Sequence, residues 1–246
     1  MDERFSRRTI LAAGATVAIA PLPALGSLGG PGTPQGKKMD PKLVRVPTEA
    51  DIAKALNTAS KGISEATHKA HLTLWQGYAN KTNEIRQKLA AVDFDPAKAN
   101  QIYSEIRALK VNYAFALGGY KNHNVYFGTI GGNGGNGGPA TGAIADEITK
   151  SFGSFADFAK QWKAVGVSSR GWAYLGWSRD EGMLEILAGD SQDTFPAWNH
   201  DLVLALDVYE HAYFLDFQTK RPAYIDAYMN CIDWDASNAL LAKAKG

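Results

Sequence analysis

Two acidic residues and a histidine interrupt an apolar run near the C-terminus. The stretch LDVYEHAYFLDF, residues 206–217, places Asp207, Glu210 and His211 within five consecutive positions. Burying a carboxylate or an imidazole is costly unless the group is paired, hydrogen-bonded or bound to a metal. Asp207 and His211 therefore form a buried ion pair, an i, i+4 pair on a helix surface, or part of a metal site.

Few other side chains could complete such a site. The chain has five histidines and a single cysteine, Cys231, so an intrachain disulfide and a cysteine-based zinc site are both excluded. His71 lies on one face of a predicted helix with Trp75 and Tyr78, at i+4 and i+7. His123 lies in a second predicted helix. If these helices pack against the C-terminal half, three imidazoles and one carboxylate could converge, a set that suits a redox-active first-row metal.

Two other histidines are interpreted differently. His68 ends the motif Glu65-Ala-Thr-His68, an E-x-x-H element that di-iron helix bundles use in pairs. Because no second copy is present, a carboxylate-bridged di-iron site is disfavoured. We expect His68 to be an exposed helix residue, with the alternative that it replaces His71 as a ligand. His200 is expected at the surface or in a loop.

The first half of the folded region has the pattern of a helical hairpin. Residues 64–91 predict a long helix with Ser64 as its N-cap, and residues 96–130 predict a second one. The short connection VDFDP between them favours an antiparallel arrangement. Residues 131–142 are rich in glycine and indicate a flexible boundary, because neither a preceding strand nor a following Lys-Ser/Thr supports a phosphate-binding loop.

The second half mixes helices and strands. The segments GWAYLGWS, MLEILAG and DLVLALD are short apolar runs typical of strands. Helices are expected at residues 142–151 and 155–165 and again at the C-terminal end, from RPAYIDAYMNCI onward. The predicted fold class is α+β: an N-terminal antiparallel helical hairpin and a C-terminal mixed domain, in which helices flank a three-stranded antiparallel sheet.

The N-terminus has the layout of an export signal. A charged start is followed by an apolar stretch that is short for a membrane span, and the pair Arg7-Arg8 resembles the twin-arginine export motif. A Sec signal or an uncleaved anchor is the alternative. The expected organisation is a signal at 1–26, a flexible leader at 27–48, the hairpin domain at 49–131, a Gly/Asn-rich linker at 132–142 and the α/β domain at 143–246. Such a protein would be periplasmic or extracellular, without stable membrane insertion after signal removal.

The overall composition is that of a globular protein. Of 246 residues, 45% are hydrophobic and 21% charged, and the formal net charge of +1 does not point to a nucleic-acid partner.

The C-terminal run also resembles a known family. Residues 207–213, DVYEHAY, are similar to the D-V-W-E-H-A-Y signature of iron/manganese superoxide dismutases. The resemblance continues through FLDFQTKRPAYIDAYMNCIDWD, and SFGSFADFAKQW, GWAYL and LEI precede it in the expected order. It covers roughly residues 50 to 245. It implies an enzyme that converts superoxide to O2 and H2O2 by alternating the redox state of one manganese or iron ion per subunit.

The resemblance also implies a ligand set. Asp207 and His211 fall on two of the four metal ligands, and His123 falls on the ligand of the second helix. The ligand of the first helix is less clear, because the family usually places a histidine eight residues before a tyrosine. His71 precedes Tyr78 by seven residues and is favoured over His68.

Further positions match residues that surround the metal in this family. Tyr78 resembles the tyrosine that guards the substrate channel, and Gln192 resembles the glutamine that hydrogen-bonds the metal-bound solvent. Gly119 stands where iron-type proteins carry that glutamine, so the combination of Gly119 and Gln192 implies the manganese type. Trp172 lies in the matching stretch GWAYL and Tyr213 in DVYEHAY, and the resemblance places both near the ligands or the subunit interface.

The resemblance further implies a homodimer, with a tetramer as a possibility. Glu210 matches the residue that reaches the ligand histidine of the neighbouring subunit. Trp75 and Phe214 depart from the family, which usually has a histidine and a tyrosine that pair across the dimer, and Tyr209 replaces the usual tryptophan. These departures support an alternative reading, a non-catalytic metal-binding or structural descendant of the fold.

Overall fold

The computed structural model describes residues 40–131, 138–193 and 197–246. The predicted signal at 1–26, most of the predicted leader and residues 132–137 of the predicted linker lie outside this part of the chain. The described residues belong to one compact unit. Within it, no helix is both long enough and apolar enough to cross a membrane.

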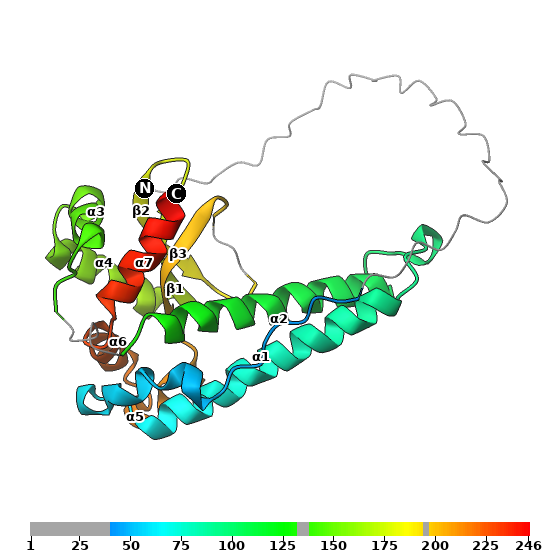
Figure 1. Ribbon diagram of the computed structural model, residues 1–246, viewed down its shortest axis with the longest axis horizontal. Coiled ribbons are helices and arrows are strands. Elements are labelled where there is room, and N and C mark those ends of the chain that lie inside the picture. Colours follow the sequence, from blue (N-terminus) through cyan, green and yellow to red (C-terminus); the bar gives the residue numbers. More distant parts are fainter. Residues whose placement is uncertain (1–39, 132–137, 194–196) are drawn as a thin grey trace, which may run out of the picture. The chain divides into compact units, whose positions relative to one another are not determined.

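Two long helices form an antiparallel hairpin, as predicted, and lie side by side in Figure 1. They are α1 (Glu65–Ala91) and α2 (Glu105–Gly128). Ser64 caps α1 as expected, because its Oγ accepts the backbone N–H of Thr67 at 3.2 Å. Two short 3-10 helices, η1 (Glu49–Ile52) and η2 (Ala55–Lys61), precede the hairpin.

The second helix begins nine residues later than the pattern predicts, at Glu105 instead of residue 96. Residues 96–98 form a separate 3-10 helix, η3 (Pro96–Lys98). Asn100 then turns the chain, because its Oδ1 accepts the backbone N–H of Ile102 at 2.9 Å, and the hydroxyl of Ser104 provides the N-cap of α2. Side-chain caps of this kind compete with helix continuation. The connection between the helices is therefore longer than VDFDP.

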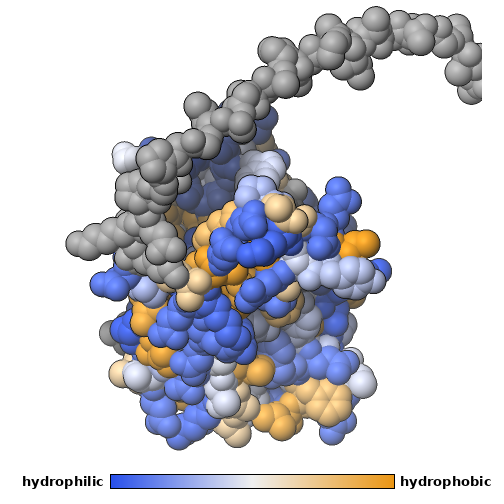
Figure 2. Space-filling model, turned by 90° about the vertical axis from the view of Figure 1, so that its right-hand side faces the viewer, coloured by the Kyte–Doolittle hydropathy of each residue, from blue (hydrophilic) through white to orange (hydrophobic). Residues whose placement is uncertain are grey.

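The free end of the hairpin carries apolar side chains in water. Ile102, expected on the buried stripe of the second helix, is 69% exposed, and Phe94 and Tyr103 beside it in the sequence connection are 59% and 89% exposed. Figure 2 faces this side of the molecule and shows apolar groups among hydrophilic ones. The stripe that does pack inside the hairpin is smaller and centres on Ile85 and Leu109.

The predicted three-stranded antiparallel sheet is present. Its strands are β1 (Trp172–Ser178), β2 (Met183–Gly189) and β3 (His200–Asp207), in the order β2-β1-β3. Every residue of the central strand β1 is buried. The register places Trp172 opposite both Gly189 and Asp207, so the start of β1 and the ends of β2 and β3 meet at one edge.

Helices flank this sheet in the C-terminal part (Figure 1). They are α3 (Ala143–Phe152), α4 (Phe155–Ser168), the 3-10 helix η4 (Glu210–Ala212), α5 (Phe214–Phe217), α6 (Arg221–Met229) and α7 (Trp234–Lys245).

One hydrophobic core joins the hairpin to the sheet. Trp75 and Phe127 from the hairpin share a cluster with Trp172 and Leu206 from the sheet. Beyond α2, the chain is tied to the segment after α6: Ile130 bridges Ile232, and the N–H of residue 131 donates to the carbonyl of Cys231 at 2.8 Å. The hairpin is thus fixed against the part of the chain that supplies the strands.

Glycine 131 offers a test of this junction. It adopts φ +79°, and a Cβ there would lie 2.0 Å from the carbonyl oxygen of Lys54. Gly131→Ala should lower the free energy of unfolding by about 2–5 kcal/mol, through left-handed strain and overlap. Gly77→Ala is the matched control, because Gly77 lies in α1 with no atom near its Cβ position. That change should stabilise by about 0.5–1 kcal/mol. Urea unfolding of both variants measures the difference in the free energy of unfolding. Equal unfolding midpoints would show that the close contact of residue 131 with Lys54 does not require glycine.

Candidate metal centre

Four side chains from four elements converge inside the core. They are His71 from α1, His123 from α2, Asp207 from the end of β3 and His211 from η4. Their nitrogen and oxygen donor atoms all lie within 4.8 Å of one another. The sequence placed the same four together as candidate ligands, and the fold brings all of them to one point.

The contacts centre on one carboxylate oxygen. Asp207 Oδ2 lies 3.1 Å from Nε2 of His71, 3.1 Å from Nε2 of His211 and 3.6 Å from Nε2 of His123. Nitrogen and oxygen ligands bind zinc-sized ions at about 2.1 Å, so two donors at about 90–120° around one ion lie about 3.0–3.6 Å apart. The measured separations therefore match donors that share a single small cation.

The metal-binding atoms of these side chains are largely buried, and a hydrogen bond fixes the orientation of one of the rings. The side chains of His71, His123 and Asp207 are 0% exposed, whereas that of His211 is 28% exposed. Nδ1 of His123 donates to the carbonyl of Gly119 at 2.6 Å, so the ring hydrogen sits on Nδ1. Its Nε2 is buried and has no hydrogen-bond partner among the described residues. A bare, inward-facing imidazole lone pair is what a metal ion requires.

The charge states suit the same purpose. Burial lowers the pKa of His123 to about 3 and also lowers the pKa of His71, so both rings are neutral near pH 7. Burial alone would raise the pKa of Asp207, but the neighbouring imidazoles of His211 and His71 hold it below its usual range. The site thus offers one anionic oxygen and uncharged nitrogens at His71 and His123, whereas the neighbouring Asp207 carboxylate raises the pKa of His211.

Tyr78 and Gln192 lie beside this cluster. The ring centroid of Tyr78 is 5.3 Å from that of His123, and its hydroxyl lies near the side chain of Gln192. Burial, with a contribution from Asp207, raises the pKa of Tyr78 to about 12, so the hydroxyl keeps its proton at neutral pH. Trp172 Nε1 donates to Oε1 of Gln192 at 3.1 Å. Gln192 is 3% exposed, and the bond from Trp172 fixes its side-chain oxygen.

Adjacent glycines in the middle of α2 make this arrangement possible. A Cβ on Gly119 would lie 2.6 Å from the ring of Tyr78, and one on Gly118 would lie 2.1 Å from the carbonyl oxygen of Gln192. Sequence reasoning missed the role of Gly118. Its signal was available, because a glycine pair weakens a helix and is retained where another segment must approach closely.

Two of the three residues that depart from the family pattern, Trp75 and Tyr209, stack on other aromatic rings. Trp75 is buried and stacks on Phe127, with centroids 5.1 Å apart and planes at 16°. Tyr209 stacks on His211 at 5.5 Å and 13°. Phe214 is 47% exposed, so it packs little within this subunit. Aromatic contacts therefore replace part of the polar network expected around the ligands.

The two remaining predicted site residues differ in exposure. Tyr213 is buried, and its hydroxyl accepts a hydrogen bond from Nε of Arg221 at 3.3 Å. Glu210 is exposed, directly before the ligand candidate His211.

Two histidine predictions were wrong. His68 is fully buried, not exposed, because η2 folds against the start of α1 and places the hydroxyl of Thr58 2.8 Å from His68 Nε2. It is not part of the four-residue cluster, which contains His71 instead. His200 is not a loop residue: it begins β3, where the residue is partly buried, and its side chain is 7% exposed and pairs with Glu185 of β2.

The donor set fits a manganese or iron ion. Three imidazole nitrogens and one carboxylate oxygen, partly open toward His211, provide the mixed ligands that redox-active first-row metals accept. Within the described residues, the site thus defines a mononuclear, histidine-rich redox metalloprotein built on an α+β fold.

Comparison with known proteins narrows this class to one family. Residues 140–240 match the family described as iron/manganese superoxide dismutases, C-terminal domain. A relative from Aquifex aeolicus, named superoxide dismutase [Fe], is 38% identical over 188 residues, which is 75% of this chain and 86% of that protein. A relative from Listeria ivanovii, named superoxide dismutase [Mn], is 35% identical over 175 residues, 68% of this chain and 83% of that protein. The chain belongs to the iron/manganese superoxide dismutases.

The choice between His71 and His68 can be tested by metal analysis. His71→Ala should lower the metal content at least about tenfold, because even loss of a supporting hydrogen bond weakens metal sites by about 10–100-fold. His68→Ala should keep the metal while losing about 2–4 kcal/mol of stability through the cavity it leaves. Elemental analysis of both purified variants, with thermal unfolding as the stability measurement, checks this. Full metal loading in His71→Ala would show that the first-helix ligand is misassigned.

Proposed function

We propose that the protein is a manganese-type superoxide dismutase that is exported and acts as a homodimer. The observation that carries the enzymatic assignment is the convergence of three Nε2 atoms on Asp207 Oδ2, at 3.1–3.6 Å, in the interior of the protein. His71, His123, Asp207 and His211 are the proposed ligands. The overall reaction consumes two superoxide ions and two protons and produces O2 and H2O2.

The proposed chemistry depends on a metal that cycles. A manganese or iron ion bound there would accept an electron from one superoxide and return it to a second. One carboxylate and three neutral imidazoles leave such a centre positively charged, which favours the approach of an anion. The dry surroundings of His71 and Asp207 strengthen that attraction, because little water screens it.

Tyr78 and Gln192 are the proposed residues that control protons and substrate beside the ion. The protonated hydroxyl of Tyr78 lies near the side chain of Gln192, whose Oε1 accepts a hydrogen bond from Trp172. This arrangement places the amide and the phenol together without adding charge to the site. It can tune the acidity of groups near the metal, and its loss should leave the metal bound.

The manganese preference rests on Gly119 and Gln192. The Tyr78 ring fills the space where a side chain at 119 would begin, so a glutamine there would require the ring to move. Gln192 supplies the amide from the loop after β2 instead. Relatives of this chain carry both metals in their names, so the ligands alone do not favour either ion.

The homodimer proposal rests on what lies outside the ligands. Glu210, Phe214 and Leu215 are exposed and lie within four residues of His211 in the sequence, and Phe214 and Leu215 are 47% and 63% exposed. Large apolar side chains grouped with a carboxylate next to a half-buried site favour coverage by a second subunit. Glu210 would then face the partner subunit, whose own site is related by two-fold symmetry; a tetramer would need a further interface.

Metal loading and activity test the enzyme and its metal type together. The purified protein reloaded with manganese alone should disproportionate superoxide at least about ten times faster per bound ion than the iron-loaded form, a barrier difference of about 1.4 kcal/mol. Elemental analysis and light scattering on the same samples should give one ion per chain and the mass of a dimer. Greater activity with iron would reject the manganese assignment only. A fully loaded but inactive protein would favour the non-catalytic alternative, and a monomer would reject the dimer.

Export is proposed from Arg7-Arg8 and the apolar stretch that follows. The twin-arginine route transports folded proteins, which suits a chain whose site is assembled from both halves of the fold. The only cysteine, Cys231, is buried, so folding needs no disulfide from the destination compartment.

Changing Arg7-Arg8 to Lys-Lys in the full chain should leave most of the protein inside the cell. Changing Lys37 and Lys38 to arginine is the matched control, because it exchanges the same two residue types outside the motif. Fractionation of cells followed by immunodetection measures the exported fraction. Undiminished export of the Lys-Lys form would reject the twin-arginine assignment.

A further inference from the structure

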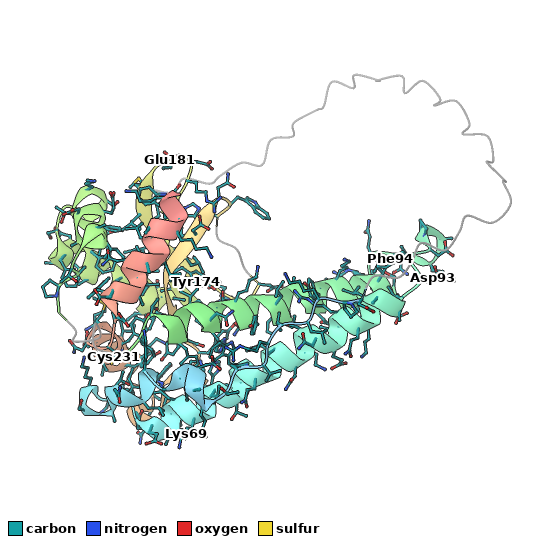
Figure 3. All side chains as sticks on the ribbon, in the orientation of Figure 1. Lys69, Asp93, Phe94, Tyr174, Glu181 and Cys231 are labelled. Carbon is teal, nitrogen blue, oxygen red and sulfur yellow. The ribbon has the colours of Figure 1, made fainter. Side chains whose placement is uncertain are left out.

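A buried tyrosine on the central strand holds the loop that carries Gln192. We propose that Tyr174 is a positioning residue: its hydroxyl fixes the amide of Asn122, and that amide holds the backbone of Gln192 in the metal centre. The inference deepens the proposed function, since it rests on a role for Gln192 beside the metal. Tyr174 lies where β1 approaches α2 (Figure 3).

The hydrogen bonds form a short chain between three segments. Asn122 Nδ2 donates to the hydroxyl of Tyr174 at 3.0 Å and to the backbone carbonyl of Gln192 at 3.1 Å. A primary amide has two N–H donors, so both are used. Asn122 is 5% exposed and Tyr174 is 3% exposed, so water does not readily replace either partner. The amide cannot turn away from Tyr174 without also releasing Gln192.

Two glycines leave room for this chain of hydrogen bonds. Gly118 lies one turn before Asn122, and its missing side chain leaves room for the Gln192 carbonyl, which a Cβ would approach to 2.1 Å. Gly189, the last residue of β2, leaves room for the Tyr174 ring, which a Cβ there would approach to 2.6 Å. The two ends of this chain of hydrogen bonds, the Gln192 carbonyl and the Tyr174 ring, are therefore each packed closely against the backbone of a glycine.

Two residues of β1 divide the task of holding Gln192. Trp172 and Tyr174 point to the same side of the strand because they are two positions apart, and their rings stack at 6.0 Å and 6°. Trp172 Nε1 binds the side-chain oxygen of Gln192, whereas Tyr174 secures its backbone through Asn122. The position of the amide relative to Tyr78 thus depends on both, and small displacements of such groups reduce catalysis strongly.

Tyr174→Phe separates this role from simple core filling, because it removes the hydroxyl and keeps the ring. In the metal-loaded full chain, backbone amides of residues 189–193 should exchange hydrogen about fivefold faster, the ratio for one lost hydrogen bond of about 1 kcal/mol. The metal content should be unchanged, and kcat should fall severalfold. Adding Asn122→Ala should change the exchange little further, because both residues act through one contact.

Tyr113→Phe is the matched control. The hydroxyl of Tyr113 also accepts hydrogen bonds, from Nε and Nη2 of Arg86, but it lies in the hairpin away from Gln192. Peptide-level exchange measured by mass spectrometry should leave residues 189–193 unaffected in this variant. Unchanged exchange in Tyr174→Phe, or equal acceleration in Tyr113→Phe, would overturn the proposal. If Gln192→Ala keeps full activity while Tyr174→Phe still accelerates exchange, the positioning holds and the proposed role of Gln192 fails.

Discussion

A carboxylate without access to water is the group on which the rest of the structure depends. Asp207 ends the buried part of β3, is 0% exposed and keeps its negative charge through neighbouring imidazoles. An isolated charge in such a place would cost several kcal/mol even after relaxation. The backbone N–H of Tyr209 donates to Asp207 Oδ1 at 2.9 Å, and the imidazoles that face Oδ2 come from α1, η4 and, at 3.6 Å, α2, so the residues next to Asp207 do not satisfy it alone. The hairpin must therefore pack on the edge of the sheet where β3 ends, and a bound cation would tighten the same contact.

Aromatic packing makes that location dry. His71 lies against the rings of Tyr126 and Phe127, at centroid distances of 4.8 and 5.0 Å, and Trp75 stacks on Phe127 from the next turn of α1. This apolar shell lowers the pKa of His71 and His123 and so preserves the neutral lone pairs that a metal needs. The same shell limits water near the ion. Hydrophobic burial and metal affinity are thus supplied by one set of contacts.

The sequence predicted the elements well where the apolar pattern was strong. The α1 helix, the three strands and the cluster around Asp207 followed from periodicity and from the family signature. Prediction from the sequence failed where a local hydrogen bond or a distant segment determined the helix boundary or the burial of a side chain. Asn100 ended one helical pattern before α2 began, and η2 covered a histidine that helix geometry alone left exposed. Contacts such as that of Gly118 with Gln192 join positions far apart in sequence, so no local pattern could specify the partner.

The glycine pair in α2 shows how a local weakness becomes a functional feature. Each glycine in a helix interior costs about 1 kcal/mol relative to alanine, yet Gly118 and Gly119 lie within the helix that presents His123. Their absent side chains admit the carbonyl of Gln192 on one side and the ring of Tyr78 on the other. The lost helix propensity is offset by the close packing of Gln192 and Tyr78 against the helix that carries His123. A helix that were more stable in isolation would hold a less complete site.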